Sequence, residues 1–95
     1  MFNIIVVDDE PAAVDYICTI IETKYSEFQV VATAQNAEEG LEKVRNYQPD
    51  LVITDIKMPI MNGIDFVAKI KKELPMIYSI TVRLQKIRDI PAILK

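Results

Sequence analysis

Short apolar runs rich in β-branched residues alternate along this chain with longer segments whose apolar residues recur at helical spacing. Alternation of this kind predicts an α/β fold, in which right-handed crossovers join parallel strands and helices cover both faces of the sheet. The predicted strands are residues 2–7, 28–34, 51–54 and 76–82, and the predicted helices are 11–23, a segment between 36 and 48, and 63–74. At usual element and loop lengths, 95 residues hold about four strand–helix units.

Residues that favour helix ends and buried helix faces support these boundaries. Pro11 suits the first helical turn, and Asn36 followed by Glu39 resembles a capping box at the start of the second helix. The third helix is predicted to turn four apolar side chains toward the core, namely Ile64, Val67, Ile70 and Leu74.

The composition excludes several classes of function. There is no histidine, which excludes a Ser/His/Asp triad, a Cys/His dyad and a histidine metal site. The single cysteine, Cys18, lies on an apolar helix face, so no internal disulfide can form and a reducing compartment is expected. The longest apolar run, 4–7, is far shorter than the ~20 residues of a membrane span. We therefore expect one soluble, untargeted domain over 1–95.

Charge is unevenly distributed along the chain. Residues 1–75 carry 7 basic and 13 acidic side chains, whereas 76–95 carry 4 basic and 1 acidic, which gives a +3 tail on a −6 body. The basic tail is short and poor in aromatic residues, so a solvated helix face explains it better than nucleic-acid binding does.

Acidic residues follow two of the predicted strands. Asp8, Asp9 and Glu10 come directly after the first, and Asp55 comes after the third. In a sheet of order 2-1-3 these strands are neighbours, so the carboxylates should converge at the carboxyl edge, where ligands bind in such folds. Like charges about 5 Å apart repel by roughly 3 kcal/mol at an effective dielectric near 20. A divalent cation would relieve this repulsion, and an all-oxygen site suits Mg²⁺.

Each of these acids also has a purely structural interpretation. Asp9 and Glu10 could lie in a first helical turn and complement the helix dipole. Asp55 could simply turn the chain at the end of a strand. The loop after Asp55 favours the functional interpretation, in which its exposed carboxylate acts as a covalent nucleophile.

Two segments closely resemble the receiver domain of two-component response regulators: IIVVDDEP at 4–11 and PDLVITDIKMPIMNGIDF at 49–66. They combine an acidic pair after the first strand, Asp55 after the third, Pro59 four residues beyond it and Gly63 eight beyond. Pro59 and Gly63 are expected to shape the loop, Pro59 by fixing φ and Gly63 by allowing a close approach or a positive φ.

The resemblance implies a flavodoxin-like parallel sheet of order 2-1-3-4 and a cytoplasmic, bacterial signalling module. It implies that Asp55 accepts a phosphoryl group from a histidine kinase or phosphotransfer protein, which supplies the histidine that this chain lacks. It further implies that Mg²⁺ is held by Asp8, Asp9, Asp55 and the backbone carbonyl of Lys57. Such a module is not an enzyme beyond self-catalysed phosphoryl transfer and autodephosphorylation.

The resemblance weakens toward the carboxyl end, so 1–82 are well matched and 83–95 form an atypical tail with a narrow apolar stripe and at most a short helix. A receiver is expected to have a switch hydroxyl near the end of the fourth strand, which Thr81 or Ser79 could supply, Thr81 lying nearer the end. It also has a lysine after a fifth strand. Lys95 is the candidate, but only 13 residues separate it from Thr81. We therefore expect the fifth strand–helix unit to be missing or rebuilt.

Two further expectations and two rival functions follow. Without a fifth strand, the fourth becomes an exposed edge, so we expect marginal stability or self-association through the fourth strand and the tail. One rival is a pseudo-receiver that works as an interaction module without phosphorylation. The other is an aspartyl phosphatase of the haloacid dehalogenase type, which would need an acid two residues after Asp55, where Lys57 stands.

Overall fold

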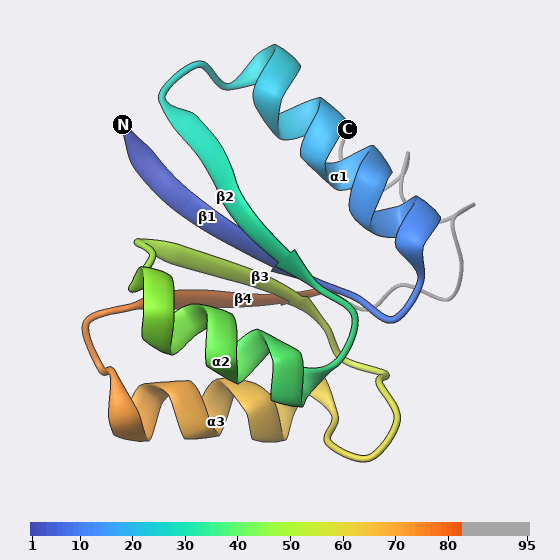
Figure 1. Cartoon of the computed structure of the whole chain (residues 1–95), viewed down its shortest axis with the longest axis vertical. Coiled ribbons are helices and arrows are strands. Elements are labelled where there is room, and N and C mark those ends of the chain that lie inside the picture. Colours follow the sequence, from blue (N-terminus) through green and yellow to red (C-terminus); the bar gives the residue numbers. More distant parts are fainter. Residues whose placement is uncertain (83–95) are drawn as a thin grey trace.

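The computed structural model describes residues 1–82, which fold into alternating strands and helices (Figure 1). The elements are β1 (Phe2–Val7), α1 (Pro11–Lys24), β2 (Phe28–Ala34), α2 (Ala37–Tyr47), β3 (Leu51–Asp55), α3 (Gly63–Glu73) and β4 (Tyr78–Val82). Every element predicted within this range is present, and the ends differ from the prediction by at most two residues. The short helix predicted after Arg83 lies outside the described residues.

The strands form one parallel sheet in the predicted order, β2-β1-β3-β4. β1 occupies a central position, and its last four residues, 4–7, are all buried. Figure 1 shows α1 on one side of the sheet and α2 and α3 together on the other. Because the strands are parallel, their carboxyl ends share one edge, and all three of these helices begin at that edge.

The alternation of side chains along the strands builds two apolar layers. The layer beneath α1 contains Ile4, Val6, Ala13, Val14, Ile17 and Ile21. The layer beneath α2 and α3 is larger and contains Ile5, Val7, Ala34, Ala37, Leu41, Val44, Val52, Met58, Phe66 and Ile70. Burial of both faces of β1 explains why its sequence is a continuous apolar run rather than an alternating one.

The prediction for the buried face of α3 is partly wrong. Ile64 is 59% exposed, whereas Phe66, which was not predicted to be buried, is 0% exposed. Ile70 is buried as predicted, and Val67 and Leu74 are half-buried. The helix is rotated so that Gly63, Phe66 and Ile70 face the sheet. This orientation buries the largest apolar side chain of the helix, which the stripe through Ile64 would have exposed.

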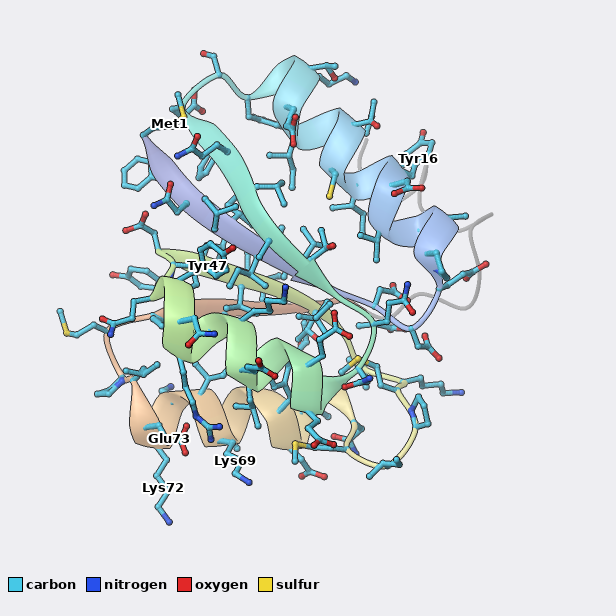
Figure 2. The ribbon with its side chains drawn as sticks, viewed as in Figure 1. Met1, Tyr16, Tyr47, Lys69, Lys72 and Glu73 are labelled. Carbon is cyan, nitrogen blue, oxygen red and sulfur yellow. The ribbon has the colours of Figure 1, made fainter. Side chains whose placement is uncertain are left out.

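The local signals at the helix starts act as predicted for α2. Asn36 is its N-cap, and the Asn36 Oδ1 accepts a 2.8 Å hydrogen bond from the Glu39 amide. An ion pair also joins the outer faces of α2 and α3, where Arg45 donates to both carboxylate oxygens of Glu73 at 2.9 and 3.1 Å. Figure 2 shows Lys69 and Glu73 projecting from the outer side of α3. Within residues 1–82, no helix is long and apolar enough to cross a membrane.

Candidate functional site

Three aspartates meet where β1 and β3 end. Val7 pairs with Thr54 in the parallel register, so the next residue of each strand, Asp8 and Asp55, follows at the same level of the sheet. One carboxylate oxygen each from Asp8, Asp9 and Asp55 lies within 4.8 Å of the others. The structure therefore brings together the aspartates that the sequence placed at this edge.

Two of these carboxylates are buried. Asp8 is 3% exposed and Asp55 is 6% exposed, while Asp9 is exposed. The expectation that Asp55 is exposed is therefore wrong, because the loop after β3 folds back against it. Burial raises the pKa of Asp8 to about 7. The amide of Glu10, which donates to the Asp8 Oδ1 at 2.9 Å, opposes this rise, and the neighbouring charges of Asp55 and Asp9 add to it. The site thus concentrates negative charge in a buried position, and its donors are hard carboxylate oxygens of the kind that Mg²⁺ prefers.

The start of α1 bears on the alternative role of the acidic pair. Glu10 is the N-cap residue of α1, and its side chain makes no capping hydrogen bond. The first turn of this helix contains no acidic residue. Asp9 and Glu10 therefore do not lie in the first helical turn, where the helix-dipole interpretation would place them.

The loop between β3 and α3 is folded back against the phosphoacceptor candidate. The Gly63 amide donates a 2.7 Å hydrogen bond to the carbonyl of Ile56, which closes the loop. A Cβ atom on Gly63 would lie 2.0 Å from the backbone oxygen of Asp55. Gly63 has no positive φ, so a close approach, one of the two predicted reasons, accounts for the glycine.

Lys57, at the start of this loop, lies beside Asp55. Its side chain is exposed, as expected, and its amide donates to the Asp55 Oδ1 at 3.4 Å. The predicted role of its backbone carbonyl as a metal ligand stays a prediction.

The tip of the loop has a conformation that the sequence did not predict. Ile60 has a φ of 71°, and its side chain has a relative exposure of 108%. Met58, two residues before Ile60, is buried, and its sulfur accepts a hydrogen bond from the hydroxyl of Thr54 at 3.9 Å. Isoleucine after proline gives no signal for a positive φ, since glycine or asparagine is the usual residue there.

Comparison with known proteins identifies the family. The family model described as the response regulator receiver domain matches residues 4–93. The chain belongs to this receiver family. The match supports both segments on which the resemblance was based and continues beyond residue 82. Receiver domains of this family are signalling modules of two-component systems.

Two curated relatives illustrate the context in which such receivers occur. A protein-glutamate methylesterase/protein-glutamine glutaminase of Oleidesulfovibrio alaskensis is 41% identical over 86 residues, which cover 86% of this chain and 23% of the relative. The transcriptional regulatory protein LnrK of Bacillus subtilis is 34% identical over 77 residues, which cover 81% of this chain and 34% of the relative. The chain thus spans about a quarter of the length of the first relative and about a third of the second.

Solved structures confirm the flavodoxin-like receiver fold. The response regulator receiver domain protein from Clostridium thermocellum superposes with a TM-score of 0.81 at 32% identity, covering 98% of this chain and 75% of that one. The response regulator domain of Thermotoga maritima CheB gives a TM-score of 0.80 at 30% identity, covering 87% of this chain and 60% of that one.

The register of β4 places the two candidate switch hydroxyls of the receiver. Thr81 pairs with Thr54, directly before Asp55, whereas Ser79 pairs with Val52. Both therefore lie on the face that α2 and α3 cover, with Thr81 nearer the carboxyl edge. Lys95 lies outside the described residues, so its proposed role and the fate of the fifth unit stay predictions.

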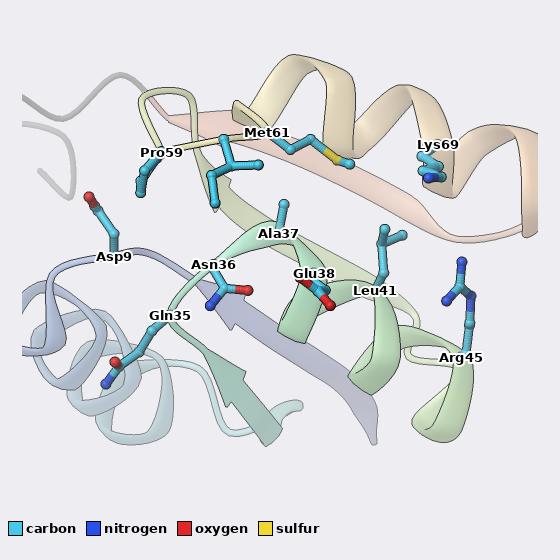
Figure 3. Close-up of a pocket in the computed structure, with 11 residues that line it drawn as sticks. Asp9, Gln35, Asn36, Ala37, Glu38, Leu41, Arg45, Pro59, Met61 and Lys69 are labelled. Atoms are coloured by element: carbon cyan, nitrogen blue, oxygen red, sulfur yellow. The ribbon is translucent and has the colours of Figure 1, made fainter.

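A groove of about 540 Å³ adjoins the aspartates between α2 and the loop after β3. In Figure 3, Asp9 and Pro59 stand at one end, Ala37 lies in the middle, and Leu41, Arg45 and Lys69 stand at the other end. The groove therefore extends the surface of the site along the flank of α2.

Proposed function

We propose that this receiver is a phosphoacceptor in which Asp55 takes a phosphoryl group from a histidine kinase or phosphotransfer protein. The observation that carries the proposal is the convergence of Asp8, Asp9 and Asp55 within 4.8 Å. Buried like charges weaken the fold, so their presence supports a role that uses them. Asp55 stands at the end of a buried strand, where the rigid sheet fixes the direction of its carboxylate.

The same carboxylates support a Mg²⁺ site. Burial, and to a smaller extent the charges of Asp55 and Asp9, raise the pKa of Asp8, and a bound divalent cation would offset this by stabilising the ionised carboxylate. The proposed ligands are Asp8, Asp9, Asp55 and the backbone carbonyl of Lys57. When bound, Mg²⁺ would also neutralise charge on the phosphoryl oxygens.

Asp55 would act as the nucleophile. One of its carboxylate oxygens attacks the phosphorus of the partner's phosphohistidine, so that an O–P bond forms as the P–N bond breaks. The electron pair of the broken bond stays on the imidazole nitrogen, which takes a proton from water. The Lys57 amide helps to orient the attacking group because it donates to the Asp55 Oδ1. Attack of water on the phosphorus later breaks the O–P bond to Asp55, releases inorganic phosphate and restores the carboxylate.

A small phosphodonor tests this proposal without a partner. The protein is incubated with acetyl phosphate, with and without Mg²⁺, and its intact mass is measured. We expect a Mg²⁺-dependent phosphoryl adduct that the Asp55→Asn variant does not form. Absence of the adduct from folded protein would overturn the phosphoacceptor role and favour the pseudo-receiver, which binds partners without phosphorylation.

We further propose a signalling role in a bacterial cytoplasm, with no catalysis beyond the receiver's own phosphoryl transfer and dephosphorylation. The relatives from Oleidesulfovibrio alaskensis and Bacillus subtilis support a bacterial origin. The methylesterase activity in the name of the first relative belongs to a chain of which this receiver covers 23%.

Self-association through β4 is a second proposal about partners. Within residues 1–82, β4 pairs on one side only, with β3. The Tyr78 amide donates to the Asp50 carbonyl at 3.1 Å, so the alternate residues Ser79 and Thr81 direct their backbone groups away from β3. Residues 76–82 contain no charge, proline or glycine that would blunt such an edge. The tail, the other part of the predicted interface, lies outside the described residues.

Light scattering coupled to size-exclusion chromatography tests this second proposal. We expect a mass that rises with protein concentration, and we expect Ser79→Pro to lower it, because proline removes an outward amide without touching the β3 ladder. A monomer at every concentration would remove the proposal.

A further inference from the structure

The tip of the loop after β3 holds an isoleucine in a strained turn. The Met61 amide donates to the Pro59 carbonyl at 2.8 Å, and the residue between them, Ile60, has a φ of 71°. These are the features of the rare γ-turn with a positive central φ, which is strained even for unbranched residues. A β-branched side chain makes this conformation still less favourable.

The side chain of Ile60, which this turn presents, is fully exposed to solvent. Ile60 has a relative exposure of 108%, so it contributes nothing to the core. Ile64, at the start of α3, is 59% exposed. The backbone of Ile60 thus opposes stability while its side chain adds none, and such retained strain supports a role in contact with another molecule.

The loop holds this side chain at a fixed place relative to Asp55. The Gly63 amide closes the loop on Ile56 at 2.7 Å, and Gly63 packs against the Asp55 carbonyl. Asp55 itself is 6% exposed, so a phosphoryl donor reaches it from the edge where the strands end. Figure 3 shows Pro59, the neighbour of Ile60, facing Asp9 across the end of the groove. Asp9 and Ile60 also line the same groove, so a protein that approaches Asp55 from this side contacts the tip of the loop.

We propose that Ile60 is a docking anchor for the protein that donates the phosphoryl group. The proposal rests on the phosphoacceptor role of Asp55, whose phosphoryl group is proposed to come from a histidine kinase or phosphotransfer protein. A protruding apolar side chain fits a concave apolar pocket, so the donor carries such a pocket beside its phosphohistidine. The strained turn fixes Ile60 before binding, which reduces the conformational entropy lost in the complex.

The experiment separates docking from chemistry by comparing a protein donor with a small one. The protein donor is taken from a panel of purified, autophosphorylated histidine kinases, as the member that transfers fastest to the unmodified receiver. Ile60→Asn removes the apolar side chain but tolerates a positive φ. Met76→Asn is the matched control, because Met76 is 89% exposed and precedes β4 at the opposite edge of the sheet.

We expect Ile60→Asn to lower kcat/KM of transfer from the kinase by about tenfold or more, the loss that follows when an isoleucine is no longer buried. Labelling by acetyl phosphate should not change in either variant, and Met76→Asn should transfer normally. Equal transfer to both variants overturns the anchor. Loss of labelling in the unmodified protein instead overturns the phosphoacceptor role itself.

Discussion

The apolar layer beneath α2 and α3 and the carboxyl edge of the sheet have opposite effects on the stability of the fold. In the layer, Phe66 and Val52 are 0% exposed and pack among other apolar side chains. At the edge, the carboxylates of Asp8 and Asp55 are buried close together, and Ile60 is both strained and exposed. Burial of apolar side chains in the layer stabilises the fold. Holding the carboxylates together and Ile60 in a strained turn lowers the stability at the edge. Substitutions in the two regions should therefore change stability with opposite signs.

Phe66→Ala, in the apolar layer, should cause the largest loss of stability. The ring is fully buried between α3 and the sheet, so its removal should lower the free energy of unfolding by about 3 to 5 kcal/mol. Urea unfolding followed by circular dichroism measures this change. The control is Ile64→Ala on the same helix, which should change stability by less than about 1 kcal/mol because Ile64 is 59% exposed. A larger loss in Ile64→Ala than in Phe66→Ala would mean that α3 faces the sheet through its other stripe.

This test bears on the part of the fold that the sequence predicted least well. The stripe through Ile64 and the stripe through Phe66 share Ile70, so helical periodicity alone permits both. The choice depends on tertiary contacts: Asn62 caps α3 through its hydrogen bond from the Asp65 amide, and Gly63 packs against the Asp55 backbone. Element order and boundaries were predictable because strand and helix periods differ, whereas the rotation of one helix was not.

At the edge, Asp8→Asn should increase stability at pH 8. The pKa of Asp8 is raised to about 7 in the folded protein, above its value in the unfolded chain. The folded state therefore binds more protons between about pH 4 and pH 7, and stability falls as pH rises through this window. The rise from 3.8 to about 7 corresponds, at about 1.4 kcal/mol per pKa unit, to roughly 4 kcal/mol, so removing the charge should stabilise the protein by up to this amount at pH 8.

The pH dependence provides the internal control for this prediction. The difference between Asp8→Asn and the unmodified receiver should shrink as pH falls toward 4, because the Asp8 carboxyl then becomes protonated in the folded chain and its buried charge is lost. Chemical denaturation at pH 8, 6 and 4 measures the difference. The variant should also lose Mg²⁺-dependent labelling by acetyl phosphate, so stability and function would change in opposite directions. A variant that is less stable at pH 8 would show that the Asp8 carboxylate stabilises this edge.

Substitution of Gly63, which lies between the apolar layer and the carboxyl edge, should cause a loss of stability of intermediate size. Gly63→Ala would place a Cβ 2.0 Å from the Asp55 backbone oxygen, so the loop must shift at a cost of about 1 to 3 kcal/mol. Gly40→Ala is the comparison, because there the nearest atom, at 2.8 Å, is the tip of the Phe66 ring rather than backbone. Alanine also favours the helix interior at position 40 by about 1 kcal/mol. Thermal unfolding should therefore rank Gly63→Ala below Gly40→Ala, and the reverse order would contradict the close approach.

The sequence predicted which residues form the candidate site, but not the conformation of the loop beside it. The meeting of Asp8, Asp9 and Asp55 follows from parallel strands and acidic residues at their ends, both of which are readable in the sequence. The γ-turn at Ile60 is not readable, because closure of the loop at Gly63 imposes it on a residue with no preference for a positive φ. The sequence thus predicts which groups gather at the edge but not how the loop beside them presents its side chains.

Ile60→Gly should cause the smallest change in the free energy of unfolding. The sign of this change shows whether the turn at Ile60 is strained. Glycine adopts a positive φ freely, so the substitution should relieve about 1 to 2 kcal/mol of backbone strain. The unfolded chain gains conformational freedom at the same time, which offsets about 0.4 to 1 kcal/mol of this gain. The net increase in the free energy of unfolding should therefore be about 1 kcal/mol or less. Ile64→Gly, also exposed but helical, should instead lose up to about 1 kcal/mol. If urea unfolding shows both variants to be less stable, the turn at Ile60 carries no strain, and the loop belongs with the stabilising layer rather than with the edge.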